Sequence, residues 1–220
     1  MILPSASWRR LSSLRSAIML YPYVAFDLRP AMMRAVLKGG FTMLNRENAV
    51  LVFIDVQGRL SELVDGAEAL FKNLRRLLEG MKALGVPVVV TEQIPEKLGS
   101  TREEFLSLIS EPPVSKTSFS CCGEKAFCKA VEKLKRTQVI LCGIETHVCV
   151  YQTALDLLEA GYEVQVVTDA VSSRDPANKA LALRRLEVEG VSLTGTEMVL
   201  FELLNDAKDP AFKSVLQIVK

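Results

Sequence analysis

The chain contains a single histidine, His147, among its 220 residues. That scarcity excludes catalytic zinc sites that use several histidines. In the helix expected from residue 147 to residue 160, His147 and Cys149 are two positions apart, so their side chains point to nearly opposite sides. A papain-like pair of cysteine and histidine is therefore excluded as well.

A regular disulfide framework is also missing. The odd number of cysteines, five, favours reduced thiols in a cytosolic or organellar compartment. The adjacent Cys121 and Cys122 lack the paired spacing of a zinc site. The others are Cys128, Cys142 and Cys149. We therefore expect no bound metal ion and no other cofactor.

Strong net charge is absent, and so are the common nucleotide-binding motifs. A formal net charge of +1 gives no general sign of nucleic-acid affinity. The chain has no P-loop, no Gly-rich dinucleotide turn and no nucleophile elbow. The apolar run near 18–26 is interrupted by Pro22 and is too short to cross a bilayer. We expect neither a nucleic-acid partner nor a membrane partner.

Residues 1–43 differ in composition from the rest of the chain. Six basic residues before Met43 are opposed only by Asp27, and serines are frequent, as in mitochondrial presequences. The same stretch is compatible with a disordered arm, or with an over-long gene prediction whose true start is Met43. We expect a cytoplasmic protein, or a mitochondrial one if residues 1–43 are a genuine presequence.

From residue 44 to residue 220 the pattern predicts one α/β domain. Short β-branched runs alternate with helical patterns, which is typical of a mainly parallel sheet covered on both faces. Expected strands span 49–54, 87–90, 138–142, 163–168 and 191–193, with a further strand ending near Lys116. Expected helices span 67–84, 102–109, 124–135, 147–160, 177–189, 197–204 and 211–219.

Three side chains follow predicted strands and are expected to converge. They are Asp55, Lys116 and Cys149. The carboxyl ends of parallel strands form the ligand crevice of such a sheet. Taken singly, each has an ordinary explanation: Asp55 as a cap, Lys116 as a solvated loop residue and Cys149 as a small core residue. Together they indicate a cysteine-nucleophile site.

The expected roles follow from the position of each residue. Thr146 is predicted to be the N-cap of the next helix, which places Cys149 in the first turn, where backbone N–H groups favour a thiolate and can bind an oxyanion. Asp55 would accept a proton, and Lys116 would stabilise negative charge. A signalling receiver domain also uses an Asp and a Lys at strand ends, but it has no use for Cys149.

Three segments together resemble the isochorismatase-like cysteine hydrolase superfamily. They are Asp55-Val56-Gln57, Lys116-Thr117-Ser118-Phe119-Ser120 and Gly143-Ile144-Glu145-Thr146-His147-Val148-Cys149. Two more, Thr91-Glu92-Gln93 and Asp169-Ala170-Val171-Ser172-Ser173-Arg174, resemble its isochorismatase domain-containing branch. The resemblance implies a three-layer α/β/α sandwich with a Rossmann-like sheet of about six strands. It also implies an Asp55, Lys116 and Cys149 triad, an oxyanion hole of the Glu145 and Cys149 amides, and a cis peptide between Ile144 and Glu145.

The segment 93–97 has no histidine, which argues against the metal-dependent nicotinamide hydrolysis known in this superfamily. The presence of Cys149 favours attack on an amide-type carbon, with Gln57, Gln93, Phe119 and Thr146 as candidate residues of the substrate pocket. The expected function is therefore an amidase-like hydrolase that cleaves a C–N bond of a small molecule through a thioester. The alternative is a non-catalytic or redox-sensing interaction protein on the same fold.

A homo-oligomer is expected from the resemblance. The apolar stretches 198–204 and 212–219 could dock against another subunit or pack within the chain.

Overall fold

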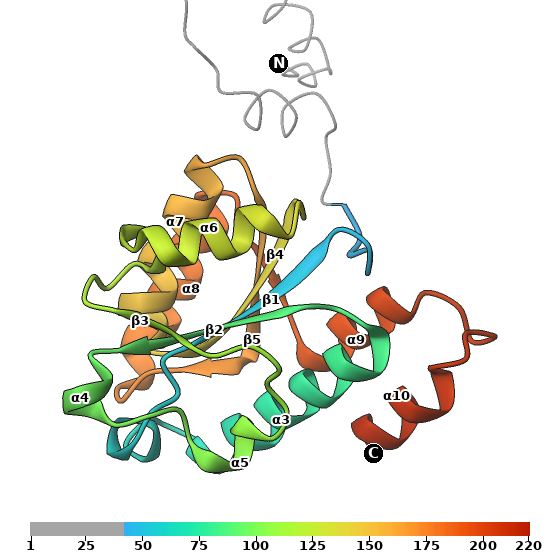
Figure 1. Ribbon diagram of the computed structural model, residues 1–220, viewed down its shortest axis with the longest axis horizontal. Coiled ribbons are helices and arrows are strands. Elements are labelled where there is room, and N and C mark those ends of the chain that lie inside the picture. The colour runs from blue at the N-terminus through green and yellow to red at the C-terminus, as the bar shows by residue number, and fades with distance from the viewer. Residues whose placement is uncertain (1–41) are drawn as a thin grey trace, which may run out of the picture.

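The computed structural model describes residues 42–220, and its centre is one six-stranded sheet (Figure 1). The predictions for residues 1–43 lie outside the described residues, except for the last two positions. No helix within 42–220 is both long enough and apolar enough to span a membrane.

All pairs of neighbouring strands are parallel, in the order β3-β2-β1-β4-β5-β6. The strands are β1 (Ala49–Ile54), β2 (Val88–Gln93), β3 (Val114–Lys116), β4 (Gln138–Ile144), β5 (Glu163–Ser172) and β6 (Ser192–Thr194). Every residue of the central strands β1 and β4 is buried, because helices cover both faces of the sheet. The chain runs from β1 through β2 to β3 at one edge, and then returns to place β4 on the other side of β1. The carboxyl ends of the neighbouring strands β1 and β4 therefore form a topological switch point.

Two helical layers enclose the sheet, so the predicted three-layer sandwich is confirmed (Figure 1). One layer contains α3 (Ala67–Leu84), α5 (Glu103–Leu106), α9 (Thr196–Leu204) and α10 (Phe212–Val219). The other contains α6 (Lys125–Lys133), α7 (Tyr151–Glu159) and α8 (Pro176–Val188). Short turns of helix connect them: η1 (Arg59–Glu62), α4 (Pro95–Leu98), η2 (Cys121–Gly123) and η3 (Thr146–Val150).

The helix α3 begins and ends where the sequence pattern predicts. Its leucines recur every three or four residues and face the sheet, where Leu74, Leu77 and Leu78 are fully buried. Gly85 ends the helix in a left-handed conformation with φ of 68°, which glycine adopts without steric cost.

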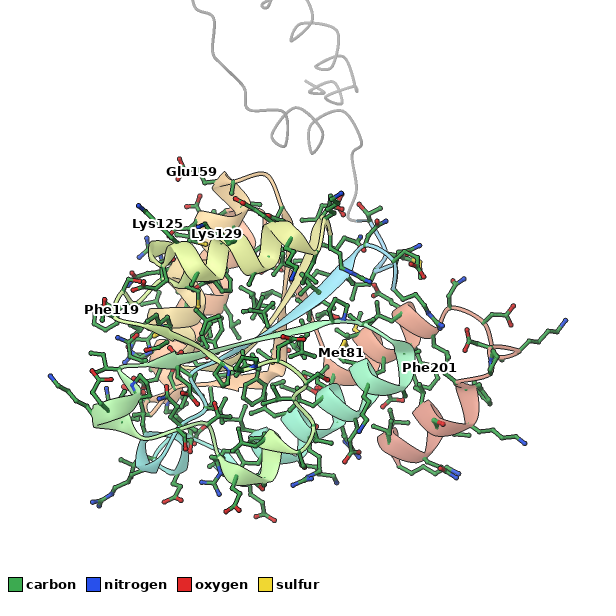
Figure 2. The ribbon with its side chains drawn as sticks, viewed as in Figure 1. Met81, Phe119, Lys125, Lys129, Glu159 and Phe201 are labelled. Carbon is green, nitrogen blue, oxygen red and sulfur yellow. The ribbon has the colours of Figure 1, made fainter. Side chains whose placement is uncertain are left out.

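The apolar C-terminal helices pack within the chain. Val199, Leu200 and Val215 belong to the same core cluster as Met81 of α3, and Phe201 packs against that cluster (Figure 2). Of the two alternatives for these stretches, the intramolecular contact is the one found.

Several predicted boundaries are wrong at the carboxyl ends of strands. β2 continues to Gln93 and β5 to Ser172, whereas the predicted strands ended at Val90 and Thr168. The strand prediction depended on apolar residues, so it stopped before the polar Thr91 and Glu92. Their backbones nevertheless pair with β3. The helix predicted over 102–109 is only the single turn α5.

Gly143 in β4 provides a test of how closely the two central strands approach. Its φ is 114°, and an added Cβ would overlap the backbone oxygen of Ile54 in β1. Gly190 has a similar φ of 97°, but no atom lies within 4 Å of an added Cβ. The variant Gly190→Ala therefore measures the cost of the backbone strain without a steric overlap. We expect Gly143→Ala to lower the free energy of unfolding by about 1–3 kcal/mol more than Gly190→Ala, because the strands must separate. Urea unfolding measures both, and equal losses would contradict the close approach.

Candidate active site

The structure brings Asp55, Lys116 and Cys149 together at the carboxyl edge of the sheet. Asp55 follows β1, Lys116 ends β3, and Cys149 lies in η3 after β4. The ammonium Nζ of Lys116 lies 2.7 Å from Oδ2 of Asp55. The Cys149 thiol lies close enough to Asp55 for the charge of that carboxylate to raise its pKa. All three are buried, with exposed fractions of 4%, 1% and 7% in chain order.

The neighbouring strand β2 holds Asp55 through two contacts from one residue. The backbone N–H of Asp55 donates to the carbonyl of Thr91 over 3.2 Å, and the Thr91 hydroxyl donates to Oδ1 over 2.7 Å. Asp55 itself has φ of 52°, a conformation that non-glycine residues adopt rarely and mainly at special sites. The carboxylate is thus held by Thr91 through one oxygen and by Lys116 through the other.

Lys116 is surrounded by oxygen atoms. Besides Asp55, its ammonium group donates to Oε1 of Gln93 at 2.5 Å and to the carbonyls of Ser118 and Phe119 at 3.1 Å each. Burial opposes its charge, but attraction to the Asp55 carboxylate outweighs that cost, so the pKa of Lys116 is raised. An ammonium group has three protons for these four acceptors. Lys116 is therefore a fixed, charged residue that orients the site.

The surroundings of Cys149 oppose the thiolate that the sequence predicts. Burial, followed by the charge of Asp55, raises the pKa of the Cys149 thiol to about 12, although Lys116 opposes the shift. With its pKa raised in this way, the resting cysteine is a neutral thiol beside the Asp55 carboxylate at neutral pH.

Thr146 is also not the N-cap that the sequence predicts. The turn η3 is a π-helical turn that begins after Glu145, and the N–H of Tyr151 reaches back to the carbonyl of Thr146. The Thr146 side chain is fully buried, and its hydroxyl has no hydrogen-bond partner among the described residues. The carbonyl of Glu145 accepts hydrogen bonds from the N–H groups of Val148 and Val150. The peptide bond between Ile144 and Glu145 is cis, as the resemblance implied.

The side chain of Glu145 anchors this turn to the end of β5. Its carboxylate accepts hydrogen bonds from Arg174 through the backbone N–H at 3.0 Å and the side-chain Nε at 3.1 Å. Burial opposes the charge, but the bonds and the charge of Arg174 together lower the pKa of Glu145. Next to this pair, Nδ1 of His147 lies 3.0 Å from Oγ of Ser173. Two side-chain contacts thus connect the turn that carries Cys149 to residues 173 and 174.

Gln57 and Gln93 lie inside the site wall and are poorly placed to contact a substrate. Gln57 accepts from the N–H of Gln93 at 2.7 Å and donates to the carbonyl of Gly99. Gln93 accepts from Lys116 and donates to the carbonyl of Thr117. Both amides are buried and occupied, so they connect the loops after β1, β2 and β3. Phe119 differs, because 56% of it is exposed at the surface (Figure 2).

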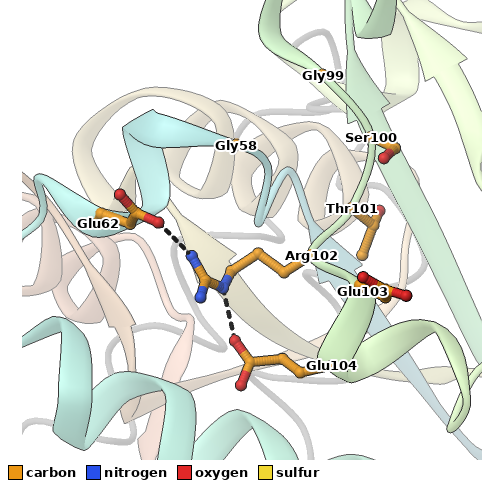
Figure 3. A pocket seen from close by; sticks show the side chains of 8 residues that line it. All are labelled: Gly58, Glu62, Gly99, Ser100, Thr101, Arg102, Glu103 and Glu104. Atoms are coloured by element: carbon orange, nitrogen blue, oxygen red, sulfur yellow. Dashed lines mark hydrogen bonds and ion pairs between the residues drawn. The ribbon is translucent and has the colours of Figure 1, made fainter.

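A surface hollow of about 730 Å³ lies beside the candidate site and contains none of the three residues. Figure 3 shows Arg102 in its wall, ion-paired with Glu62 at 2.9 Å and Glu104 at 2.6 Å. The same guanidinium lies 4.4 Å from the ring centre of Phe71. The hollow meets the site only indirectly, where Gln57 donates to the carbonyl of Gly99 in its lining. We therefore assign the chemistry to the buried triad and not to this hollow.

Sequence reasoning missed Thr91 and Cys121 as neighbours of the triad and gave Arg174 no role. Thr91 and Arg174 lie in segments that resemble the isochorismatase domain-containing branch, and that resemblance could have indicated that they belong to the site. Nothing in the sequence connects Cys121 to Asp55, because their proximity depends on the turn η2. Within residues 42–220, no group of three or more His, Cys, Asp or Glu side chains could hold a metal ion.

The isochorismatase domain family matches residues 49–198, well over half of the chain. The chain belongs to the isochorismatase family. Isochorismatase domain-containing protein 2 of Danio rerio is 39% identical over 180 residues, which cover 82% of this chain and 91% of that protein. The predicted family branch and fold class are confirmed.

Solved structures of similar chains agree with this assignment. The MAR1 ribonuclease structure from Caenorhabditis elegans has a TM-score of 0.77 and 35% identity, and the match covers 81% of this chain and 92% of that one. YcaC from Pseudomonas aeruginosa, described with hexane-2,5-diol and covalent acrylamide, has a TM-score of 0.77 and 26% identity, with 81% and 93% covered. The fold of this chain is that of the isochorismatase-like hydrolases.

Proposed function

We propose that this protein is a cysteine hydrolase that cleaves an amide-type C–N bond of a small molecule through a thioester on Cys149. The observation that carries the proposal is the ion pair between Asp55 and the buried Lys116, with the Cys149 thiol close enough for the charge of Asp55 to raise its pKa. A neutral thiol of high pKa needs a base at the moment of attack, and Asp55 is in contact with it.

In the first half-reaction, the Cys149 sulfur attacks the carbonyl carbon while its proton passes to Asp55. The new C–S bond forms, and the π electrons of the carbonyl move onto its oxygen. When the carbonyl re-forms, the C–N bond breaks, and the leaving nitrogen takes the proton from Asp55. An amine or ammonia departs, and the acyl group remains on sulfur.

In the second half-reaction, water attacks the thioester and gives a proton to Asp55. The C–S bond breaks, the sulfur takes that proton, and a carboxylic acid leaves. The sum is hydrolysis of one amide by one water, so no oxidant, reductant or cofactor is required. The residues return to a thiol beside a carboxylate.

The negative oxygen of each tetrahedral intermediate would be bound by the backbone N–H groups of Glu145 and Cys149, at the start of η3. Removing one such donor typically costs about 10²–10³-fold in rate. Lys116 would act through Asp55, since its ammonium is already bonded to four oxygen atoms. The contact between Glu145 and Arg174 would keep the oxyanion turn in place.

A small substrate accords with burial of the triad and with the near-neutral net charge of +1. The ribonuclease named for the nematode protein would have to bind a polyanion, for which basic surfaces are typical. We keep the homo-oligomer expected from the sequence as part of the proposal. The alternative, a redox-sensing or interaction protein with an idle site, is decided by the following test.

Acrylamide is the probe for the nucleophile, supported by its covalent presence in the Pseudomonas structure. In the addition, sulfur bonds to the terminal vinyl carbon, and the thiol proton ends on the neighbouring carbon. We expect a single adduct at about pH 7, located on Cys149 by peptide mass spectrometry and absent in Cys149→Ala. The double variant Cys122→Ser/Cys128→Ser is the matched control, since these two thiols are the partly exposed ones. This double variant should keep the adduct. In a separate assay, the wild type should release an amine from a panel of small amides. An unmodified Cys149 would overturn the proposal.

A further inference from the structure

Two buried side chains outside the triad, Thr91 and Cys121, form a chain of hydrogen bonds that ends on Asp55. The thiol of Cys121 donates to Oγ1 of Thr91 over 3.7 Å, and Thr91 donates to Oδ1 of Asp55 over 2.7 Å. Both Thr91 and Cys121 have exposed fractions of 0%. Neither residue has a part in the reaction as written above.

The direction of these hydrogen bonds follows from the chemistry of the groups. A carboxylate only accepts, so Thr91 must give its single hydroxyl proton to Asp55. Its oxygen then accepts from Cys121, whose thiol pKa is raised to about 11 by burial and by the charge of Asp55, so that it stays protonated at neutral pH. With both sides of the hydroxyl occupied, the Thr91 proton has one favourable direction.

The helix that follows Cys149 also positions Cys121. The N–H of Cys121 donates to the hydroxyl of Thr153 in α7 at 2.9 Å, and the Ser120 hydroxyl donates to Asp156 of the same helix at 2.6 Å. Since α7 continues directly from η3, one rigid element carries the nucleophile and anchors the far end of the hydrogen-bond chain. The helix α7 therefore links the turn that carries Cys149 to the outer end of this hydrogen-bond chain.

We infer that Thr91 is a positioning residue, which orients the Asp55 carboxylate to receive the Cys149 proton, and that Cys121 sets the direction of the Thr91 hydroxyl. This inference rests on the proposed function. The charged and titratable groups that face Asp55 are Lys116 from β3, Cys149 from η3 and, through Thr91, Cys121 from η2. Without the Thr91 hydroxyl, the carboxylate loses the hydrogen bond that fixes its plane.

The test compares Thr91→Val, which keeps the shape of the side chain, with Thr91→Ser, which keeps the hydroxyl. The rate of acrylamide addition to Cys149 is measured from about pH 6 to about pH 9, with thermal unfolding as a check on folding. We expect Thr91→Val to react roughly tenfold more slowly at neutral pH, a typical loss for a hydrogen bond to a charged group. Thr91→Ser should react at close to the wild-type rate.

Thr194→Val is the matched control, because Thr194 is a buried strand threonine of the same sheet whose hydroxyl has no partner among the described residues. It should leave both the rate and the pH profile unchanged. If Thr91→Val reacts like Thr194→Val, the positioning role is wrong while the nucleophile stands. If wild-type Cys149 forms no adduct at all, the proposed function and this inference both fall. Should Thr91→Val not fold, Cys121→Ala is expected to slow the addition and Cys121→Ser to restore it, and equal rates would overturn the inference.

Discussion

Replacing Asp55 by asparagine is expected to slow acrylamide addition to Cys149 by about 10²–10⁴-fold at neutral pH, the usual contribution of a positioned base. The amide has nearly the same shape but cannot take the thiol proton. Burial, the main cause of the raised Cys149 pKa, persists in the variant, so the thiol remains neutral although the carboxylate charge is gone. The observed rate constant, followed by intact mass against time, measures the loss.

The pH dependence of the same variant gives a sharper readout than the rate alone. In Asp55→Asn only thiolate formed by solvent can react, so the rate should rise about tenfold per pH unit below the thiol pKa. The wild type should show a much shallower slope, since the proton passes to Asp55 inside the site. Equal slopes for the two proteins would show that Asp55 is not the base.

Replacing Lys116 by methionine is expected to lower the free energy of unfolding by about 3–5 kcal/mol, because the buried Asp55 carboxylate loses its counter-charge. Methionine fills much of the space of the lysine stem, so the loss reports mainly on charge. Urea unfolding at neutral pH measures the change. Lys129→Met, at an exposed position on α6, is the control and should stay within about 0.5 kcal/mol of the wild type (Figure 2).

Combining Lys116→Met with Asp55→Asn should recover part of that stability, because neither charge is then left buried without its partner. Asp55→Asn alone should destabilise less than Lys116→Met. Lys116 keeps three oxygen acceptors after Asp55→Asn, from Gln93, Ser118 and Phe119. After Lys116→Met, the Asp55 carboxylate keeps the hydrogen bond from Thr91 but no counter-charge. A Lys116→Met protein as stable as Lys129→Met would contradict the buried ion pair.

Much of the fold could be predicted from local pattern. The bounds of β1 and α3 agree with prediction to the residue, since an unbroken apolar run and a three-to-four-residue leucine repeat are strong signals. The predictions failed at strand ends, where Thr91 and Ser172 continue strands through pairing with neighbours that are distant in sequence. A polar residue at a strand end has no periodicity that distinguishes it from a loop.

The candidate site divides in a similar way. Its three central residues could be chosen from sequence, because each follows a strand and parallel strands bring their carboxyl ends to one edge. The charge state of Cys149 could not, since burial is the main cause of its raised pKa and the degree of burial is a tertiary property. The same holds for Gln57 and Gln93, whose amides are occupied by backbone groups of three different loops.

The family, the three-layer architecture and the residues at the strand ends could all be predicted before the fold was known, because these depend on short-range pattern and chain order. The folded arrangement was needed to learn that four oxygen atoms surround the Lys116 ammonium, that Cys149 is a thiol beside Asp55, and that Thr91 and Cys121 support that carboxylate. The physical reason is that hydrogen-bond partners and desolvation depend on which groups packing brings within about 3–4 Å, and no local pattern encodes that.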